Sequence, residues 1–293
     1  MSLAKVEGAP ALARWTGRIA LFSLVLLLFA VVAHRFFGMS TPLLLSLIKL
    51  AFAGAIAAIV LGLVCAVHIW RHGGPGGARI LTAFVVAAGM LAWPLAYYPT
   101  MKRLPEINDI TTSTDAPPAF QVLAASRDAP ANGAAYRAER FATLQHAAYP
   151  DLKPLVVNRS SEEVFDLVVE AVRRQKLAIV SETPPGPTNG RVGSIEAIDQ
   201  TLVMGFKDDV AIRVSGGDRE AHVDVRSASR YGRHDFGRNV QRIRALMREI
   251  VVRLESTIPG AAENRHARKR GPEREEKPSV RKGADRKKEA PRQ

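Results

Sequence analysis

Residues 210–229 read VAIRVSGGDREAHVDVRSAS, in which apolar and polar side chains alternate on both sides of a glycine pair. Alternation with a period of two is typical of a strand that buries one face, and adjacent glycines suit the turn of a hairpin. The stretch therefore predicts two antiparallel strands with one apolar and one polar face. The residues expected on the apolar face are Val210, Ile212, Val214, Val223 and Val225. Those expected on the polar face are Asp209, Arg213, His222, Asp224, Arg226 and Arg230.

The segments on either side of this hairpin predict the other elements of one α+β domain. Ser160 followed by Glu163 is a capping-box pattern, which predicts a helix from there to about Lys176. Apolar residues at helical spacing predict a second, longer helix over residues 235–255. Further strands are expected at residues 155–157, 177–182, 192–199 and 202–206. This order predicts a curved antiparallel sheet whose apolar face is covered by two helices.

Three long apolar runs precede the domain, at residues 19–33, 50–70 and 80–98. The hydrocarbon core of a bilayer is crossed by a helix of about 20 residues. The runs therefore predict an α-helical transmembrane anchor with spans at about residues 19–38, 50–70 and 80–99. The second run carries small residues at spacings of four, which is typical of a packing seam between helices in lipid.

Two interpretations of the first run remain open at this point. Because Lys5, Arg14 and Arg18 precede it, the run is either a membrane span or the core of a cleaved secretory signal peptide. Near the helix ends, five Lys or Arg lie on the N-terminal side of the membrane and four on the other, which favours a cytoplasmic N-terminus. Both interpretations place the soluble domain outside the cytoplasm. We therefore expect a multi-pass protein of the inner (plasma) membrane with a periplasmic domain, for a Gram-negative source.

The formal net charge of +13 is distributed unevenly along the chain. Residues 1–103 carry nine Lys or Arg and one acid, residues 104–259 carry 20 bases and 21 acids, and residues 260–293 carry 12 bases and six acids. The middle part is nearly neutral, so no specific binding of nucleic acid is expected. These divisions predict a membrane region, a soluble α+β domain and a disordered basic tail, because the last segment has too few apolar residues to fold.

Three strings of residues carry a family resemblance. They are NDITT at 108–112, FKDDVAIRV at 206–214 and VDVRSASRYGRHDFGRN at 223–239. In this order, and followed by an amphipathic helix, they resemble the bacterial family called domain of unknown function 1499. The resemblance covers residues 106–256 and implies that they form one domain, and the membrane-anchored arrangement is similar to that of family members. It implies no reaction, no ligand and no catalytic residue.

The polar face of the hairpin is the candidate ligand site. Guanidinium groups beside carboxylates can hold a carboxylate or a phosphate, and the NDITT string would add further polar groups. The alternative is that this face is solvated and that its charges form modest cross-strand pairs, while the NDITT residues build a turn. The candidate ligand-binding residues are Arg213, Asp224, Arg226, Arg230, Asn108 and Asp109.

Other polar residues favour structural roles. Asp235 is expected to cap the helix that follows it rather than to leave that helix start open to an anion. Asp208 and Asp209 are neighbours in a strand and point to opposite faces, which disfavours a shared cation. Cys65 is the single cysteine, and no spacing of cysteine and histidine is typical of zinc, so no metal and no cofactor is expected. Nor does the sequence contain a nucleophile elbow or a phosphate-binding loop motif.

These observations predict a membrane-anchored envelope module that is not an enzyme. Its expected partners are the lipid bilayer and, through the polar face, an anionic small molecule, a lipid headgroup or an envelope protein. The alternative is a membrane-anchored hydrolase or transferase that uses Asp and Arg residues on an exposed sheet face. A third possibility, a cytoplasmic adaptor whose basic tail binds anionic lipid or nucleic acid, requires the opposite topology.

Overall fold

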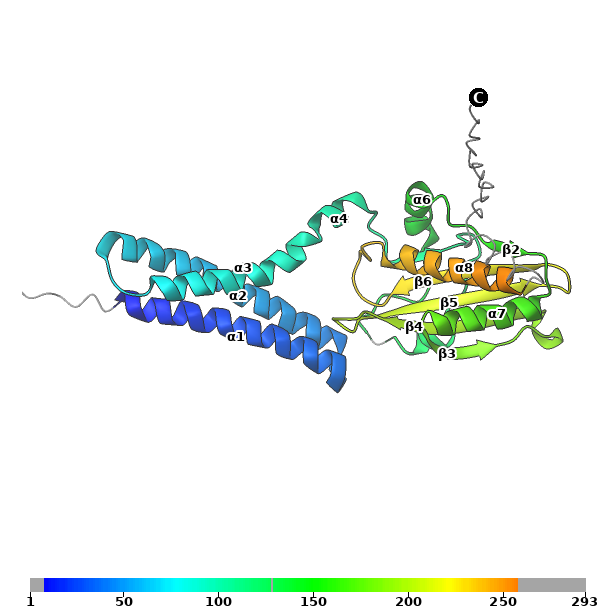
Figure 1. Ribbon diagram of the computed structural model, residues 1–293, viewed down its shortest axis with the longest axis horizontal. Coiled ribbons are helices and arrows are strands. Elements are labelled where there is room, and N and C mark those ends of the chain that lie inside the picture. The colour runs from blue at the N-terminus through cyan, green and yellow to red at the C-terminus, as the bar shows by residue number, and fades with distance from the viewer. Residues whose placement is uncertain (1–7, 128, 258–293) are drawn as a thin grey trace, which may run out of the picture.

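The structure is a computed structural model that describes residues 8–127 and 129–257. Figure 1 shows two parts arranged along the long axis of the molecule, a bundle of three long helices and a sheet with helices packed against it. The basic tail predicted at residues 260–293 lies outside the described residues.

The bundle consists of α1 (Gly8–Phe37), α2 (Thr41–His72) and α3 (Gly77–Ala96). Each of the three is long and apolar enough to cross a membrane, which indicates a membrane anchor. The predicted spans are therefore confirmed as helices, but α2 begins well before residue 50. Pro42 lies in the first turn of α2, a position that suits proline, and Lys49 does not interrupt the helix. Only residues 38–40 are left to connect α1 with α2.

The small residues of α2 form a packing seam, as their spacing predicts. Ala51, Ala55 and Ala58 are fully buried in the bundle. A Cβ atom at Gly54 would collide with Ser23 of α1, and one at Gly62 would lie 2.7 Å from the ring of Phe84 in α3. Larger side chains at these positions would force the three helices apart.

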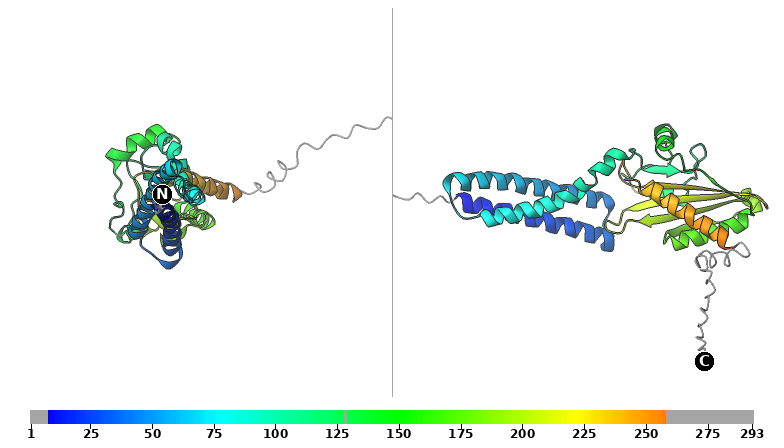
Figure 2. Two further views of the ribbon diagram at one scale, coloured as in Figure 1. Left: turned by 90° about the vertical axis from the view of Figure 1, so that its left-hand side faces the viewer. Right: turned by 45° about the horizontal axis from the view of Figure 1, so that its top comes forward.

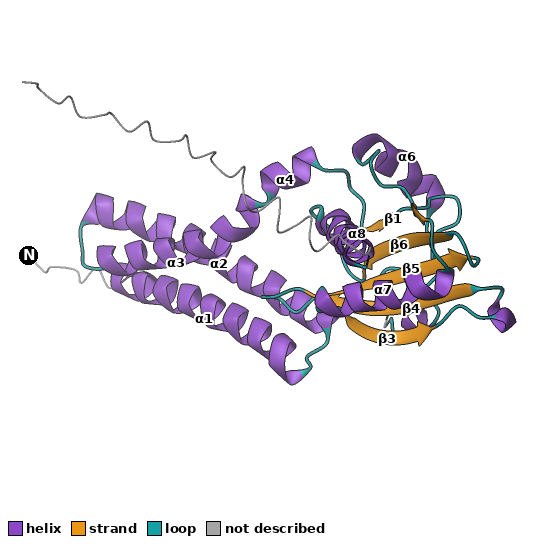
Figure 3. Cartoon of the chain, turned by 45° about the vertical axis from the view of Figure 1, so that its right-hand side comes forward, coloured by secondary structure: helices purple, strands orange, loops and turns teal. Residues whose placement is uncertain are grey.

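The short helix α4 (Tyr98–Arg103) continues α3 and leads into the sheet. The strands of the sheet are β1 (Asp109–Thr111), β2 (Leu155–Val157), β3 (Ala178–Thr183), β4 (Val192–Gln200), β5 (Lys207–Gly216) and β6 (Ala221–Ser229). Their order is β1-β6-β5-β4-β3, every pair is antiparallel, and β2 pairs with the first residues of β6 (Figure 3). In the central hairpin Ile212 lies opposite Val225 and Val214 opposite Val223, which confirms the predicted apolar face.

Helices α7 (Ser161–Arg174) and α8 (Arg238–Ser256) lie across this apolar face (Figure 2). The hydroxyl of Ser160 accepts a hydrogen bond from the backbone N–H of Glu163 at 3.2 Å, so the predicted cap of α7 is formed. Gly193 of β4 lets the ring of Phe165 approach closely, because a Cβ atom there would lie 2.5 Å from that ring. The α+β fold with two helices over one face of an antiparallel sheet is confirmed.

The strand predicted at residues 202–206 is wrong, because this segment is the turn between β4 and β5. The two strands pair as far as Gln200 and Lys207, so the residues between them must reverse the chain. Gly205 has a φ of +74°, which favours glycine, and the apolar side chain of Leu202 is 83% exposed. The alternative that the NDITT residues build a turn is wrong as well, because Asp109–Thr111 form the strand β1.

A loop-rich segment covers the polar face of the sheet. It runs from β1 through α5 (Val122–Ala125) to α6 (Ala138–Ala148). Phe120 and Leu123 pack on Ala211 of β5 and Ala228 of β6, whose small side chains leave room for them. The alternative interpretation, that this face of the sheet is solvated, is therefore wrong.

Candidate functional site

Arg226 and Asp109 form a buried ion pair under this cover. The Arg226 side chain is only 2% exposed, and its Nε and Nη2 donate to the two carboxylate oxygens of Asp109 at 2.9 and 2.7 Å. The same guanidinium donates to the backbone carbonyls of Pro118 and Ala134, and its carbon lies 4.5 Å from the centre of the Phe120 ring. Burial raises the pKa of the Asp109 carboxyl, and the guanidinium opposes that shift.

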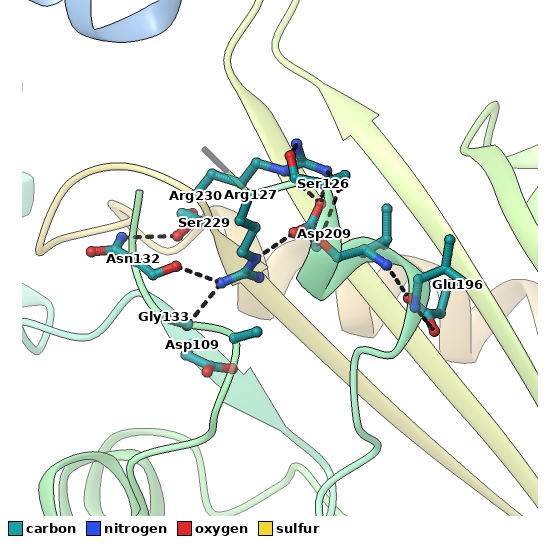
Figure 4. Close-up of polar contacts among 12 residues, drawn as sticks. Asp109, Ser126, Arg127, Asn132, Gly133, Glu196, Asp209, Ser229 and Arg230 are labelled. Carbon is teal, nitrogen blue, oxygen red and sulfur yellow. Dashed lines mark hydrogen bonds and ion pairs between the residues drawn. The ribbon is translucent and has the colours of Figure 1, made fainter. Parts of the chain in front are cut away.

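Asp209 is the centre of a second buried cluster (Figure 4). Its carboxylate is fully buried and accepts from Nε of Arg127 and Nε of Arg230, each at 2.8 Å. Arg230 also donates to the backbone carbonyl and the hydroxyl of Ser126, at 3.2 and 3.0 Å. The cluster thus fastens the covering segment to the sheet.

Glu196 of β4 fastens the same segment at a third point. Its carboxylate accepts from the backbone N–H groups of Gln121, Val122 and Leu123, at 2.8, 3.0 and 2.8 Å, where α5 begins (Figure 4). A carboxylate is favoured at a helix start because the first amides of a helix have no partner within it. Neither Glu196 nor Arg127 was predicted as a site residue. Only the alternation of polar residues along β4 indicates that Glu196 lies on this face.

The other predicted site residues also have protein partners. Nη2 of Arg213 donates to Asp224 at 2.6 Å and to the carbonyl of Ala116 at 2.7 Å, and Arg213 keeps part of its surface exposed. The Nδ2 of Asn108 donates to the carbonyl of Gly232 at 2.6 Å. The structure thus brings five of the predicted residues into one polar layer under the covering segment, Arg213, Asp224, Arg226, Arg230 and Asp109, of which Arg213 stays partly exposed. The Asn108 side chain instead bonds to the loop after β6. The premise of an exposed catalytic face, on which the hydrolase or transferase alternative depended, is therefore wrong.

The acidic residues outside this layer hold α8 in place. Asp208 and Asp209 point to opposite faces, as predicted, and Asp208 pairs with Arg242 of α8 at 2.7 Å. Asp235 accepts from the N–H groups of Gly237 and Asn239, each at 2.9 Å, while Gly237 occupies the N-cap position itself. Asp235 therefore caps α8, as predicted, but it lies two residues before the N-cap position because the helix begins only at Arg238. Burial raises the pKa of Asp235, against the effect of these two hydrogen bonds.

A cavity of about 660 Å³ lies where the α1–α2 connection meets the soluble domain. Its walls come from the end of α1, the start of α2, the facing ends of β4 and β5, and the residues after β6. Its described lining residues include no acid. The basic residues that line it are His34, Arg35, Lys207 and Arg230.

Two residues of this cavity have incomplete hydrogen bonding, Arg35 and His34. Nη1 of Arg35 and Nε2 of His34 are buried and have no hydrogen-bond partner in the described part of the chain. Arg230 is paired with the carboxylate of Asp209, so its charge is compensated. The side chain of Lys207 is exposed. The start of α2 also faces the cavity, and the Ser40 side chain makes no capping hydrogen bond there. The positive end of a helix beside unneutralised cations favours an anion.

Residues 8–127 and 129–257 contain no group of three or more His, Cys, Asp or Glu side chains placed to hold a metal ion. Residues 109–250 match the model of a family described as protein of unknown function (DUF1499), which confirms the resemblance seen in the sequence. A search of curated proteins finds no match to the chain. The family match begins at β1 and ends within α8. It includes Asp109, Arg213, Asp224, Arg226 and Arg230 but leaves out Asn108, Arg35 and the membrane helices.

Proposed function

The chain carries a DUF1499 domain at residues 109–250, and we propose that it is a non-enzymatic, membrane-anchored binding module for an anionic ligand. The ligand site in this proposal is the basic cavity between the α1–α2 connection and the domain. The polar face of the sheet serves the fold, because its Asp and Arg residues are paired with one another under the covering segment.

The observation that carries the proposal is the buried Nη1 of Arg35, which lacks a partner within the described residues. A buried N–H donor without a hydrogen bond costs free energy that a ligand oxygen would recover. Lys207 adds a second positive charge to the same cavity, and the backbone N–H of Thr41 at the start of α2 adds a further donor. A phosphate or a carboxylate offers the charge and the acceptor oxygens that these groups lack.

We expect a phosphate monoester to bind this cavity. The probe is sn-glycerol 3-phosphate, titrated at low salt into the full chain in detergent and followed by calorimetry. The double substitution Arg35→Gln and Lys207→Gln should raise the Kd at least about tenfold, because it removes both uncompensated charges and loses about 1.4 kcal/mol or more. The matched control is Arg219→Gln in the exposed β5–β6 turn, at the far end of β5, which should change the Kd less than about twofold. Equal Kd values for all three proteins, or no binding at all, would contradict the proposal.

We place the domain on the periplasmic side of an inner membrane. This proposal rests on the excess of Lys and Arg at the end of the bundle that contains Arg14, Arg18, Arg71 and Arg79. A reporter that is active only outside the cytoplasm, fused after residue 259, should give signal, and a reporter active only inside should be silent. The reverse pattern would assign the domain to the cytoplasm and direct the search for ligands there.

A further inference from the structure

The turn between β4 and β5, residues 201–206, presents apolar side chains to its surroundings. Leu202 is 83% exposed and Val203 is 59% exposed. Single exposed apolar residues are ordinary on a protein surface, but these two are adjacent and lie at the tip of a hairpin. The turn is also held in one shape, because Gln200 Nε2 donates to the Gly205 carbonyl at 3.1 Å and Phe206 N to the Thr201 hydroxyl at 2.8 Å.

The turn lies against the end of the membrane helices (Figure 1). A Cβ atom on Gly205 would be 3.2 Å from Cδ of Arg35, and the rings of His34 and Phe206 are 6.0 Å apart. The apolar tip is thus fixed to the last turns of α1. By contrast, the β5–β6 turn lies at the other end of β5, ten residues or about 30 Å away.

The residues at the same end of the bundle are typical of helices where they meet the membrane surface. Phe36 and Phe37, in the last turn of α1, are 74% and 80% exposed. Tyr97 and Tyr98 at the junction of α3 and α4 are exposed as well, and such residues are enriched where a helix leaves the bilayer. The span of α1, Ala11–Phe37, is 27 residues or about 40 Å long, which reaches from one headgroup region to the other.

We propose that the β4–β5 turn is a second membrane contact, which inserts Leu202 and Val203 into the bilayer that holds the three helices. The bilayer is the partner of Leu202 and Val203 because the contact with α1 holds the turn at the membrane surface where α1 ends. The contact is independent of the ligand proposed for the cavity and fixes how the domain lies on the membrane.

The test uses the full chain with Cys65→Ala, reconstituted in vesicles of phosphatidylcholine and phosphatidylglycerol. Leu202→Cys is labelled with a fluorophore whose emission depends on the polarity of its surroundings. The matched control is Asp218→Cys in the β5–β6 turn, labelled in the same way. At Leu202 we expect a blue-shifted emission, quenching by lipids brominated on the acyl chain, and several-fold weaker quenching by iodide than at position 218. A label at Val203→Cys should behave like the one at Leu202.

Two outcomes would overturn the inference. Equal quenching by iodide at positions 202 and 218 would mean that the turn is in water. Protection from iodide without quenching by brominated lipid would mean that protein, and not the bilayer, covers the turn. Neither outcome bears on the binding of glycerol phosphate by Arg35 and Lys207, so the two proposals can fail separately.

Discussion

Replacing Arg226 by methionine is expected to lower the free energy of unfolding of the domain by about 3 to 5 kcal/mol. Methionine keeps much of the volume of the side chain, but it leaves the carboxylate of Asp109 and the carbonyls of Pro118 and Ala134 buried without their donor. The loss should appear as a lower transition temperature of the β-sheet signal when the full chain is heated in detergent.

Two further variants test whether the loss of stability comes from breaking the buried ion pair or from removing any charge. Adding Asp109→Asn to Arg226→Met removes the stranded carboxylate and should recover part of the lost stability. Arg191→Met breaks an exposed pair with Asp218 and should cost less than about 1 kcal/mol. A loss at Arg226 no larger than the loss at Arg191 would show that the buried pair does not stabilise the fold.

The effect of Arg226→Met should also depend on pH. Burial raises the pKa of Asp109, and removing the guanidinium that opposes this shift should raise it further. A carboxyl whose pKa is higher in the folded than in the unfolded state destabilises the fold as pH rises through that interval. The difference in transition temperature between wild type and variant should therefore be larger at pH 8 than at pH 5. A difference independent of pH would mean that the carboxyl is not the group left uncompensated.

Asp209→Asn is expected to have an effect of similar size, about 3 to 5 kcal/mol. The substitution keeps the shape of the side chain but turns one acceptor oxygen into a donor that faces the guanidinium groups of Arg127 and Arg230. Both arginines then remain buried without a negative partner. Chemical unfolding of the full chain, followed by the signal of the sheet, measures the loss.

The control for Asp209 is Asp151→Asn. Asp151 also pairs with an arginine through two hydrogen bonds, but its partner Arg244 and the carboxylate itself are exposed. This variant should cost less than about 1 kcal/mol. A free energy of unfolding of Asp209→Asn that differs from wild type no more than that of Asp151→Asn would contradict the structural role of Asp209.

The elements of the fold that have a periodic or local sequence pattern could be predicted from the sequence. Apolar runs of bilayer length gave the membrane helices, and the alternation along residues 210–229 gave the central hairpin with its correct apolar face. The pair of Ser160 and Glu163 located the start of α7, because capping depends on residues three positions apart. Each of these features is local, so neighbouring residues suffice to specify it.

The cover over the polar face could not be predicted in the same way. The segment with Pro117, Pro118 and Phe120 has no period of two or 3.6, so nothing in it indicates which surface it meets. The charges of the hairpin therefore suggested an exposed site. Their actual partners come from this segment and from β1, and a buried charge cannot be told from a solvated one until its partner is known.

The turn and the cavity were missed for two different reasons. Leu202 and Val203 have the composition of a strand, and only the pairing of Gln200 with Lys207 shows that the chain must reverse there. The cavity joins Arg35 to residues far along the chain at the start of β5 and the end of β6. No pattern within a single segment indicates such a meeting of distant residues.

Because β1 pairs with β6, the last strand of the sheet, the sheet cannot close until synthesis of the domain is nearly complete. Asp109 leaves the ribosome 117 residues before Arg226, its partner on the neighbouring strand β6. At roughly 5 to 20 residues per second, the first strand waits about 6 to 23 s for the last one. The membrane helices emerge before either strand. We therefore expect the nascent chain to be attached to the bilayer while its first strand is still unpaired, so that the sheet closes beside the membrane only near the end of synthesis.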